Sequence, residues 1–239
     1  GRLHQRRLVQ PQAVDHLVVW AGREAPHEPG LDDLAVRFLQ ERENPAVCEI
    51  PVVVGHFRQL GDVDEVGDSV AKLKLALVKE LGYHAIQFHD DDVVPWGYDA
   101  QATRKKAAEI KSMCDDAGIA VEFVAPRLWE DEKGIDGGIT ANDPQIRKWA
   151  LERSKWAIDI ADELGTQNMV LWPAREGTYL RESKDAIAAT GYMVEYLNAL
   201  LDYHPRIRIL GEMKPNEPMD LAYCPTTGHF LSLAYATSD

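Results

Sequence analysis

Residues 142–172, NDPQIRKWALERSKWAIDIADELGTQNMVLW, contain one complete unit of helix followed by strand. Asn142 or Asp143 is typical of the residue that caps a helix, and Pro144 is favoured in the first turn. Apolar side chains then recur at helical spacing until a glycine ends the pattern. The β-branched and apolar run that closes the stretch predicts a strand.

The same unit recurs along the chain. A helix end, a glycine and a strand follow one another at Glu80-Leu81-Gly82, Asp116-Ala117-Gly118 and Glu163-Leu164-Gly165. The pattern predicts strands over residues 47–54, 85–88, 120–125, 168–172 and 206–212. It also predicts that further helices open at Asp68, Asp99 and Ser183.

Strands that alternate with helices imply parallel pairing and right-handed crossovers, hence either a doubly wound sheet or a (β/α) barrel. No GxGxxG or GxxxxGK[ST] pattern follows any predicted strand, which weakens the nucleotide-binding alternative. We therefore expect an α/β fold with about five βα units of an incomplete (β/α) barrel. We divide the chain into a poorly legible N-terminal segment, 1–45, and a partial barrel domain, 46–239.

Composition restricts the partners and the compartment. The 239 residues carry a formal net charge of −13, which argues against a nucleic-acid partner because such binding needs a basic face. Three cysteines far apart, Cys48, Cys114 and Cys224, support neither a disulfide framework nor a CxxC metal site. With no run of eighteen apolar residues and no signal-peptide pattern, we expect a cytoplasmic protein without a membrane partner.

Polar side chains follow four of the predicted strands, at the end where barrel enzymes hold their reactive groups. They are His89 to Asp92 after the strand at 85–88, Arg127 and Trp129 after 120–125, Trp172, Arg175 and Glu176 at the end of 168–172, and Glu212, Lys214 and Glu217 at the end of 206–212.

Each of these groups has a functional and a structural interpretation. His89 is followed by three aspartates that repel one another, so a cation or a function must hold them together; otherwise they cap the next segment. One aspartate could orient the imidazole for proton transfer or hydroxyl binding. Trp172 is either an apolar wall for a sugar or plain core. Glu212 and Lys214 either converge on one ligand or belong to an ordinary charged loop.

Five segments, in order, resemble motifs of the xylose isomerase family. Phe88-His89-Asp90-Asp91-Asp92-Val93-Val94-Pro95 resembles its FHDDDxxP segment, and residues 136–143, DGGITAND, resemble its DGGxTAND. WPAREG at 172–177 is similar to its WGGREG, and EMKPNEP at 212–218 to its EPKPNEP. PTTGH at 225–229 continues the match, so that the resemblance covers roughly residues 62–239.

The resemblance implies a metal-dependent aldose–ketose isomerase on a (β/α)8 barrel, usually a homotetramer, with two Mg²⁺, Mn²⁺ or Co²⁺ ions. By position Glu212 would be a metal ligand, and hard divalent ions choose carboxylate oxygens. The substrate would be an aldose sugar, D-xylose converted to D-xylulose or D-glucose to D-fructose, and the partner a dimer or tetramer of the same chain.

The resemblance also implies roles for five further residues. His89, oriented by Asp92, would bind the ring oxygen and help ring opening, and Lys214 would stabilise charge that develops on the substrate oxygen. Trp172 would form the apolar wall along which hydride shifts. Trp129 would bind the substrate, at a position where the family usually has phenylalanine.

The departures from the family leave alternatives open. Its remaining metal ligands belong to strands beyond those predicted here, so we expect weak activity from a chain with one ligand position. Ala125, Pro126 and Arg127 replace a small polar run, which leaves substrate preference open. One alternative is a sugar epimerase or dehydratase on the same barrel. Another is an inactive fragment that serves as an assembly module, because an open parallel sheet has unpaired edges.

Overall fold

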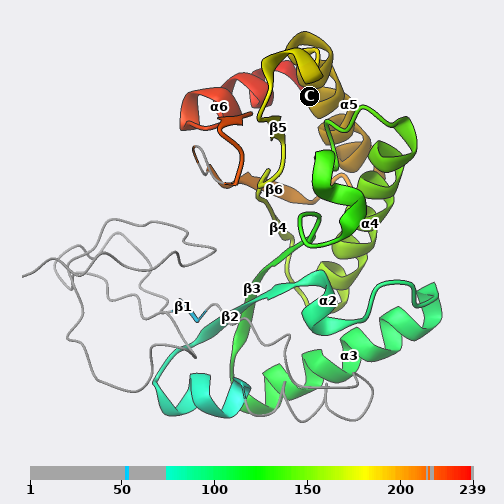
Figure 1. Cartoon of the computed structure of the whole chain (residues 1–239). Coiled ribbons are helices and arrows are strands. Elements are labelled where there is room, and N and C mark those ends of the chain that lie inside the picture. Colours follow the sequence, from blue (N-terminus) through cyan, green and yellow to red (C-terminus); the bar gives the residue numbers. More distant parts are fainter. Residues whose placement is uncertain (1–51, 54–73, 214, 216–217, 238–239) are drawn as a thin grey trace, which may run out of the picture.

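A computed structural model describes residues 52–53, 74–213, 215 and 218–237 of the chain (Figure 1). The N-terminal segment 1–45, the predicted helix start at Asp68 and all of the predicted strand 47–54 except Val52–Val53 lie outside these residues. Residues 74–80 are helical, as the apolar spacing before Gly82 predicts. None of the helices described is long and apolar enough to cross a membrane.

The centre of the structure is a parallel sheet whose strands follow chain order, β1-β2-β3-β4-β6. Val52 pairs with Ala85, Phe88 with Val124, and Leu171 with Gly211. The strands are β1 (Val52–Val53), β2 (Ala85–His89), β3 (Ala120–Ala125), β4 (Asn168–Leu171) and β6 (Arg208–Gly211). A short antiparallel pair, β5 (Gly177–Thr178) and β7 (Leu221–Ala222), lies apart from this sheet.

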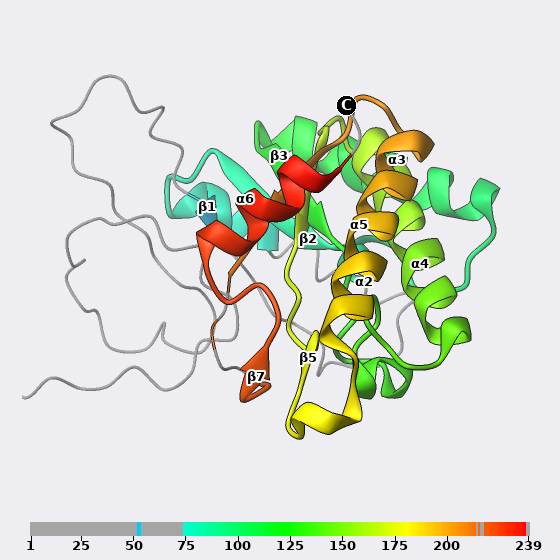
Figure 2. The ribbon, with the colours of Figure 1, turned by 90° about the horizontal axis from the view of Figure 1, so that it is seen from above.

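Helices α3, α4 and α5 lie along one side of the sheet, and the strands curve along their inner side (Figures 1 and 2). This is the arrangement of an open arc of a (β/α) barrel, the fold class expected from the βα repeat. The helical segments are α2 (Asp90–Val93), α3 (Ala100–Ala117), η1 (Glu132–Asp136), α4 (Pro144–Glu163), η2 (Arg181–Ser183), α5 (Ala186–Tyr203) and α6 (Thr227–Ala236).

Capping residues explain most helix boundaries. The Asp99 side chain accepts hydrogen bonds from the first turn of α3, and Asp143 does the same for α4, which resolves the choice between Asn142 and Asp143. The prediction that Ser183 opens a helix is wrong. Ser183 ends η2, and α5 begins after Asp185. The Asp185 carboxylate accepts from the Ile187 and Ala188 backbone N–H groups and so takes the capping position two residues after Ser183.

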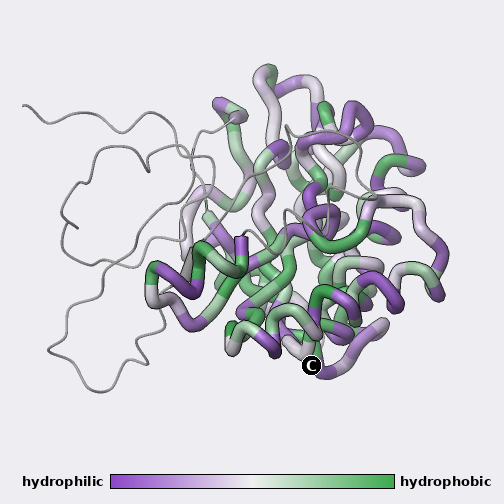
Figure 3. The backbone as a smooth tube through the Cα atoms, turned by 90° about the horizontal axis from the view of Figure 1, so that it is seen from below, coloured by the Kyte–Doolittle hydropathy of each residue, from purple (hydrophilic) through white to green (hydrophobic). Residues whose placement is uncertain are grey.

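Two apolar clusters join the helices to the strands, and hydrophobic and hydrophilic stretches alternate along the helices (Figure 3). The first packs Ile86 and Phe88 of β2 against α3 and α4, and it includes Trp156. The second packs Met169 and Leu171 of β4 against α4 and α5. Burial of these side chains is the main stabilising contribution to the arc. Cys114 and Cys224 are free, buried thiols.

The opposite face of the strands carries a row of polar side chains near their amino ends. Gln87 Nε2 donates to Glu122 Oε2 at 2.7 Å, Asn168 Nδ2 donates to the Glu122 carbonyl at 2.9 Å, and Arg208 Nε donates to Asn168 Oδ1 at 2.8 Å. Because side chains alternate along a strand, His89 shares the face of Gln87, and Trp172 that of Asn168. The face of the sheet opposite the helices therefore carries this polar row and, at the carboxyl ends of the strands, His89 and Trp172.

Candidate functional site

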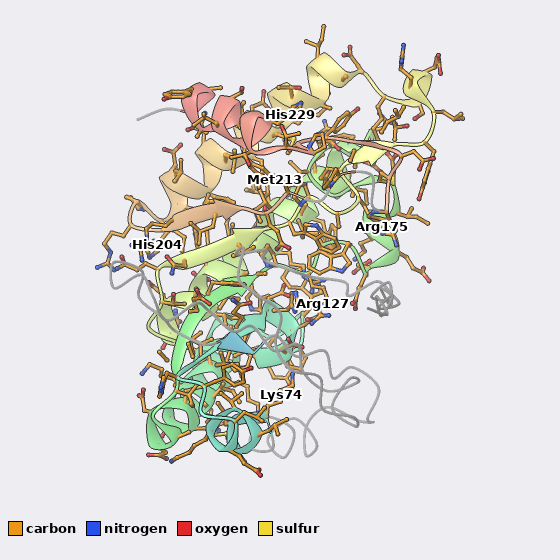
Figure 4. All side chains as sticks on the ribbon, turned by 90° about the vertical axis from the view of Figure 1, so that its left-hand side faces the viewer. Lys74, Arg127, Arg175, His204, Met213 and His229 are labelled. Carbon is orange, nitrogen blue, oxygen red and sulfur yellow. The ribbon has the colours of Figure 1, made fainter. Side chains whose placement is uncertain are left out.

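The carboxyl ends of the strands bring together residues that are far apart in the sequence. His89 is the last residue of β2, Trp172 directly follows β4, and Glu212 directly follows β6. In Figure 4, Arg127 and Arg175, from the loops that follow β3 and β4, lie on the side opposite His204, which precedes β6. The edge that carries these groups is the one where parallel α/β sheets bind ligands.

His89 and Asp92 form the first pair of this edge. His89 Nδ1 lies 3.4 Å from Asp92 Oδ2, and the His89 backbone N–H donates to the same oxygen at 3.2 Å. The aspartate run forms the single helical turn α2, with His89 as its N-cap. A carboxylate beside Nδ1 favours the tautomer that carries its proton there. In this tautomer Nε2 is the acceptor nitrogen of the imidazole.

The ionisation of Asp92 is set by its surroundings. Burial alone would raise the pKa of the Asp92 carboxyl. The hydrogen bond with His89 and the positive charges of Lys74 and Arg127 outweigh that effect and hold the pKa well below its ordinary value. Asp92 is therefore an anion at neutral pH, as the orientation of His89 requires.

Two arginines hold the three aspartates together. Arg127, 1% exposed, donates from Nε to Asp91 at 2.8 Å and from Nη2 to Asp92 at 3.0 Å. Arg153 of α4 donates to Asp90 at 2.7 Å and to Asp91 at 3.0 Å. Burial raises the pKa of Asp90, and the hydrogen bonds from Arg153 oppose that rise. Guanidinium groups thus supply the positive charge that the aspartate run requires.

Trp129 and Trp172 form an aromatic wall beside His89. The two indole rings meet edge to face, with centroids 4.5 Å apart and planes at 77°. Trp129 also meets the His89 imidazole edge to face at 5.4 Å. Trp172 is buried and Trp129 is half-buried, so a continuous aromatic surface runs from β4 to the end of β2. Such a surface can pack against the apolar face of a sugar ring and exclude water from it.

The last strand end is described only in part. Glu212 is half-buried, and its backbone N–H donates to the Leu171 carbonyl at 3.0 Å, which extends the β4–β6 ladder by one residue. This places Glu212 beside Trp172. Lys214 and Glu217, the other charged residues expected here, lie outside the described residues.

The described donors do not fit a pair of divalent cations. Among the residues that the structure describes, no group of three or more His, Cys, Asp or Glu side chains could hold a metal ion. Asp90 and Asp91 are engaged by guanidinium groups, and both oxygens of Glu176 accept hydrogen bonds from residues 138–140. Glu212 as a metal ligand stays a prediction.

Arg153 is a neighbour of the candidate site that the sequence patterns above do not single out. A usable signal exists, because Arg153 lies three residues after Ala150 and four before Ala157, both buried on α4. A charged residue on the apolar stripe of a helix indicates a buried ionic partner. By contrast, Glu176, which the sequence places among the ligand-facing groups, turns away into the protein and is 2% exposed.

Comparison with known proteins supports the fold. The sequence model of one family, the xylose isomerase-like TIM barrels, matches residues 75–235. A D-psicose 3-epimerase has a TM-score of 0.52 at 14% identity over 69% of this chain and 53% of that one. D-allulose 3-epimerase from Methylomonas sp. gives 0.50 at 18% identity over 70% and 53%. The 3-keto-D-glucoside 4-epimerase of E. coli gives 0.50 at 13% identity over 71% and 58%. The chain thus spans about half the length of these solved structures.

Proposed function

This chain belongs to the family of xylose isomerase-like TIM barrels, and from that premise we propose that it acts on a cyclic aldose as an aldose–ketose isomerase. The observation that carries the proposal is the aromatic wall of Trp129 and Trp172 next to a histidine held by a carboxylate. This arrangement offers one apolar face and one proton-transfer group to the same ligand. D-xylose, converted to D-xylulose, and D-glucose, converted to D-fructose, are the proposed substrates.

Each residue of the site has a separate role in ring opening or hydride transfer. Nε2 of His89 moves the proton that opens the sugar ring, while Asp92 holds the imidazole. Against the wall of Trp129 and Trp172, where water is excluded, the hydrogen on C2 passes to C1 as a hydride. The proton on O2 passes to O1, so that the reaction needs no external oxidant or reductant. Lys214, by the family motif, stabilises the negative charge on the substrate oxygen.

Epimerisation is the second candidate. The observation that favours it is that the three solved structures compared above are named as sugar epimerases. In that reaction a base at the strand ends removes a proton from carbon and the proton returns to the other face. The two reactions share the sugar, the wall and the strand ends. They differ in whether the migrating hydrogen exchanges with water.

Product analysis in D₂O separates the two. The chain is incubated with D-xylose, D-glucose or D-fructose and with Mg²⁺, Mn²⁺ or Co²⁺, and products are followed by NMR. An aldose-to-ketose product without carbon-bound deuterium supports isomerisation. Deuterium at an epimerised carbon supports epimerisation instead. Because Glu212 is the single expected metal ligand, we expect turnover below the ordinary range of about 1–10³ s⁻¹.

Sugar binding is measured in parallel, so that slow turnover does not obscure the result. Saturation transfer from the protein to D-xylose should be seen with the wild type and lost on Trp172→Ala. His89→Gln should leave binding within about threefold and lower turnover at least tenfold. His204→Gln, a histidine at the other end of the strands, is the control. A chain that neither turns over nor binds any of these sugars refutes the proposal.

A further inference from the structure

Glu176 is a buried carboxylate that the proposed reaction does not use. Its two oxygens accept four hydrogen bonds, all from one short segment. Oε1 accepts from the Gly138 and Ile139 backbone N–H groups at 2.8 and 2.9 Å. Oε2 accepts from the Thr140 backbone N–H at 2.8 Å and from the Thr140 hydroxyl at 2.6 Å. The segment 138–140 is thus a cradle for an internal anion, formed largely by successive backbone N–H groups.

The cradle requires glycine at position 137, and Gly138 is in ordinary contact with it. Gly137 has φ +82°, and a Cβ there would lie 2.7 Å from Glu176 Oε2. Gly138 lies against the same carboxylate, with a Cβ position 3.6 Å from Oε1. The DGG and REG segments, about forty residues apart, are therefore two halves of one contact, a relation that neither segment reveals alone.

The residue next to Glu176 links this contact to the loop that carries Trp129. Arg175, the residue before Glu176, donates from Nε to the Trp129 carbonyl at 2.7 Å. Two consecutive residues of the loop after β4 are thus tied to the loop after β3. Trp172 begins the first of these loops and Trp129 belongs to the second, so the relative position of the two indole rings depends on this double tie.

We propose that Glu176 is a positioning residue, which holds Trp129 and Trp172 edge to face by joining their two loops. The inference rests on the proposed function, because it assigns the wall a role in sugar binding. The relative position of the two indole rings can be measured without sugar. Glu176 itself touches no substrate.

The substitution Glu176→Gln tests this with almost no change of shape. Each carboxylate oxygen accepts from at least one backbone N–H, so either orientation of the amide points an NH₂ group at a backbone donor that cannot accept from it. Thr140→Val removes one of the four hydrogen bonds, and Thr140→Ser keeps all four. Glu182→Gln, six residues further on and exposed, is the matched control.

The readout is the exciton circular dichroism of the two indoles, isolated as the difference between each protein and its Trp129→Phe version. This subtraction removes the contribution of the Trp96–Trp156 pair, whose rings also meet edge to face. We expect the difference couplet to fall by at least half in Glu176→Gln, to fall less in Thr140→Val, and to persist in Thr140→Ser and Glu182→Gln. The dissociation constant for D-xylose should rise at least tenfold in Glu176→Gln.

A purely structural role predicts another result, namely a lower unfolding temperature with an unchanged couplet in the folded protein. An unchanged couplet in Glu176→Gln overturns the proposal, and so does unchanged D-xylose affinity where the wild type binds. If Glu176→Gln does not fold, the couplet of Thr140→Val decides in the same way. If the wild type binds no sugar, the couplet still tests the position of the rings, and only the proposed function fails.

Discussion

Replacement of Arg127 by methionine removes the guanidinium that joins the end of β2 to the loop after β3. Three charge-assisted hydrogen bonds are lost, to Asp91, Asp92 and Glu130. Removing one partner of a buried ion pair costs about 3–5 kcal/mol. The Glu130 carboxylate is partly exposed and adds little.

The lower end of that range applies, because two of the carboxylates keep another partner. Asp91 retains Arg153, and Asp92 retains His89. We therefore expect a loss of about 3 kcal/mol in the free energy of unfolding at neutral pH. With urea slopes of about 1–3 kcal/mol/M, the midpoint should fall by about 1–3 M.

The assay is urea denaturation followed by far-UV circular dichroism, with Arg104→Met as the control. Arg104 is exposed on α3, and its replacement should change stability by no more than about 0.5 kcal/mol. Arg127→Lys keeps the charge without the planar fork and should fall between methionine and wild type. A loss below about 1 kcal/mol in Arg127→Met, with an unchanged slope, would show that the aspartates do not depend on this guanidinium.

Three further sets of substitutions test the Asp92 carboxylate, two glycines at positive φ and a buried tyrosine. Because the pKa of Asp92 is lowered, its ionised form stabilises the fold above its ordinary pKa of about 3.9, and this contribution is lost as the pH falls. Asp92→Asn should therefore flatten the acid side of a curve of unfolding free energy against pH. An unchanged acid side would contradict a lowered pKa for Asp92. Gly118→Ala, at φ +71° with open space around it, should lower the free energy of unfolding by about 1 kcal/mol. Gly177→Ala should lower it clearly more in the same urea assay, because its Cβ would meet the backbone of β7 at 2.5 Å. Tyr196→Phe, which removes the buried hydrogen bond to Ser154, should lower the free energy of unfolding by about 1 kcal/mol, and an unchanged thermal midpoint would refute that estimate.

Local signals in the sequence were sufficient for the strands and most helix ends. Asp99 and Gly118 bracket α3 because capping depends only on neighbouring backbone groups. The repeat of about forty residues predicted the parallel order, since each βα unit repeats the same local pattern. The predicted strands 168–172 and 206–212 each end one residue beyond β4 and β6, and the second starts two residues before β6. These differences are the ordinary uncertainty of a boundary.

Contacts between loops were not predictable in the same way. Sequence patterns placed His89, Trp129, Trp172 and Glu212 at one edge, and the structure brings the first three into contact. Nothing local indicates that Glu176 points into the protein, because its partners lie in a segment about forty residues earlier. The catalytic and binding roles of His89, Trp129, Trp172 and Glu212 stay predictions, which the experiments above test.

The sequential strand order has a consequence for how the arc assembles. From β2 onward, each strand of the parallel sheet hydrogen-bonds to the previous strand of that sheet, and the cross-strand polar contacts span 35, 46 and 40 residues. The entropy of closing a loop grows only with the logarithm of its length, so each new βα unit joins the growing edge at nearly the same cost. During synthesis, which proceeds from the N-terminus, β2 and β3 can pair while β6 is still untranslated. The order in which the ribosome releases the units is therefore also the order in which the edge can accept them.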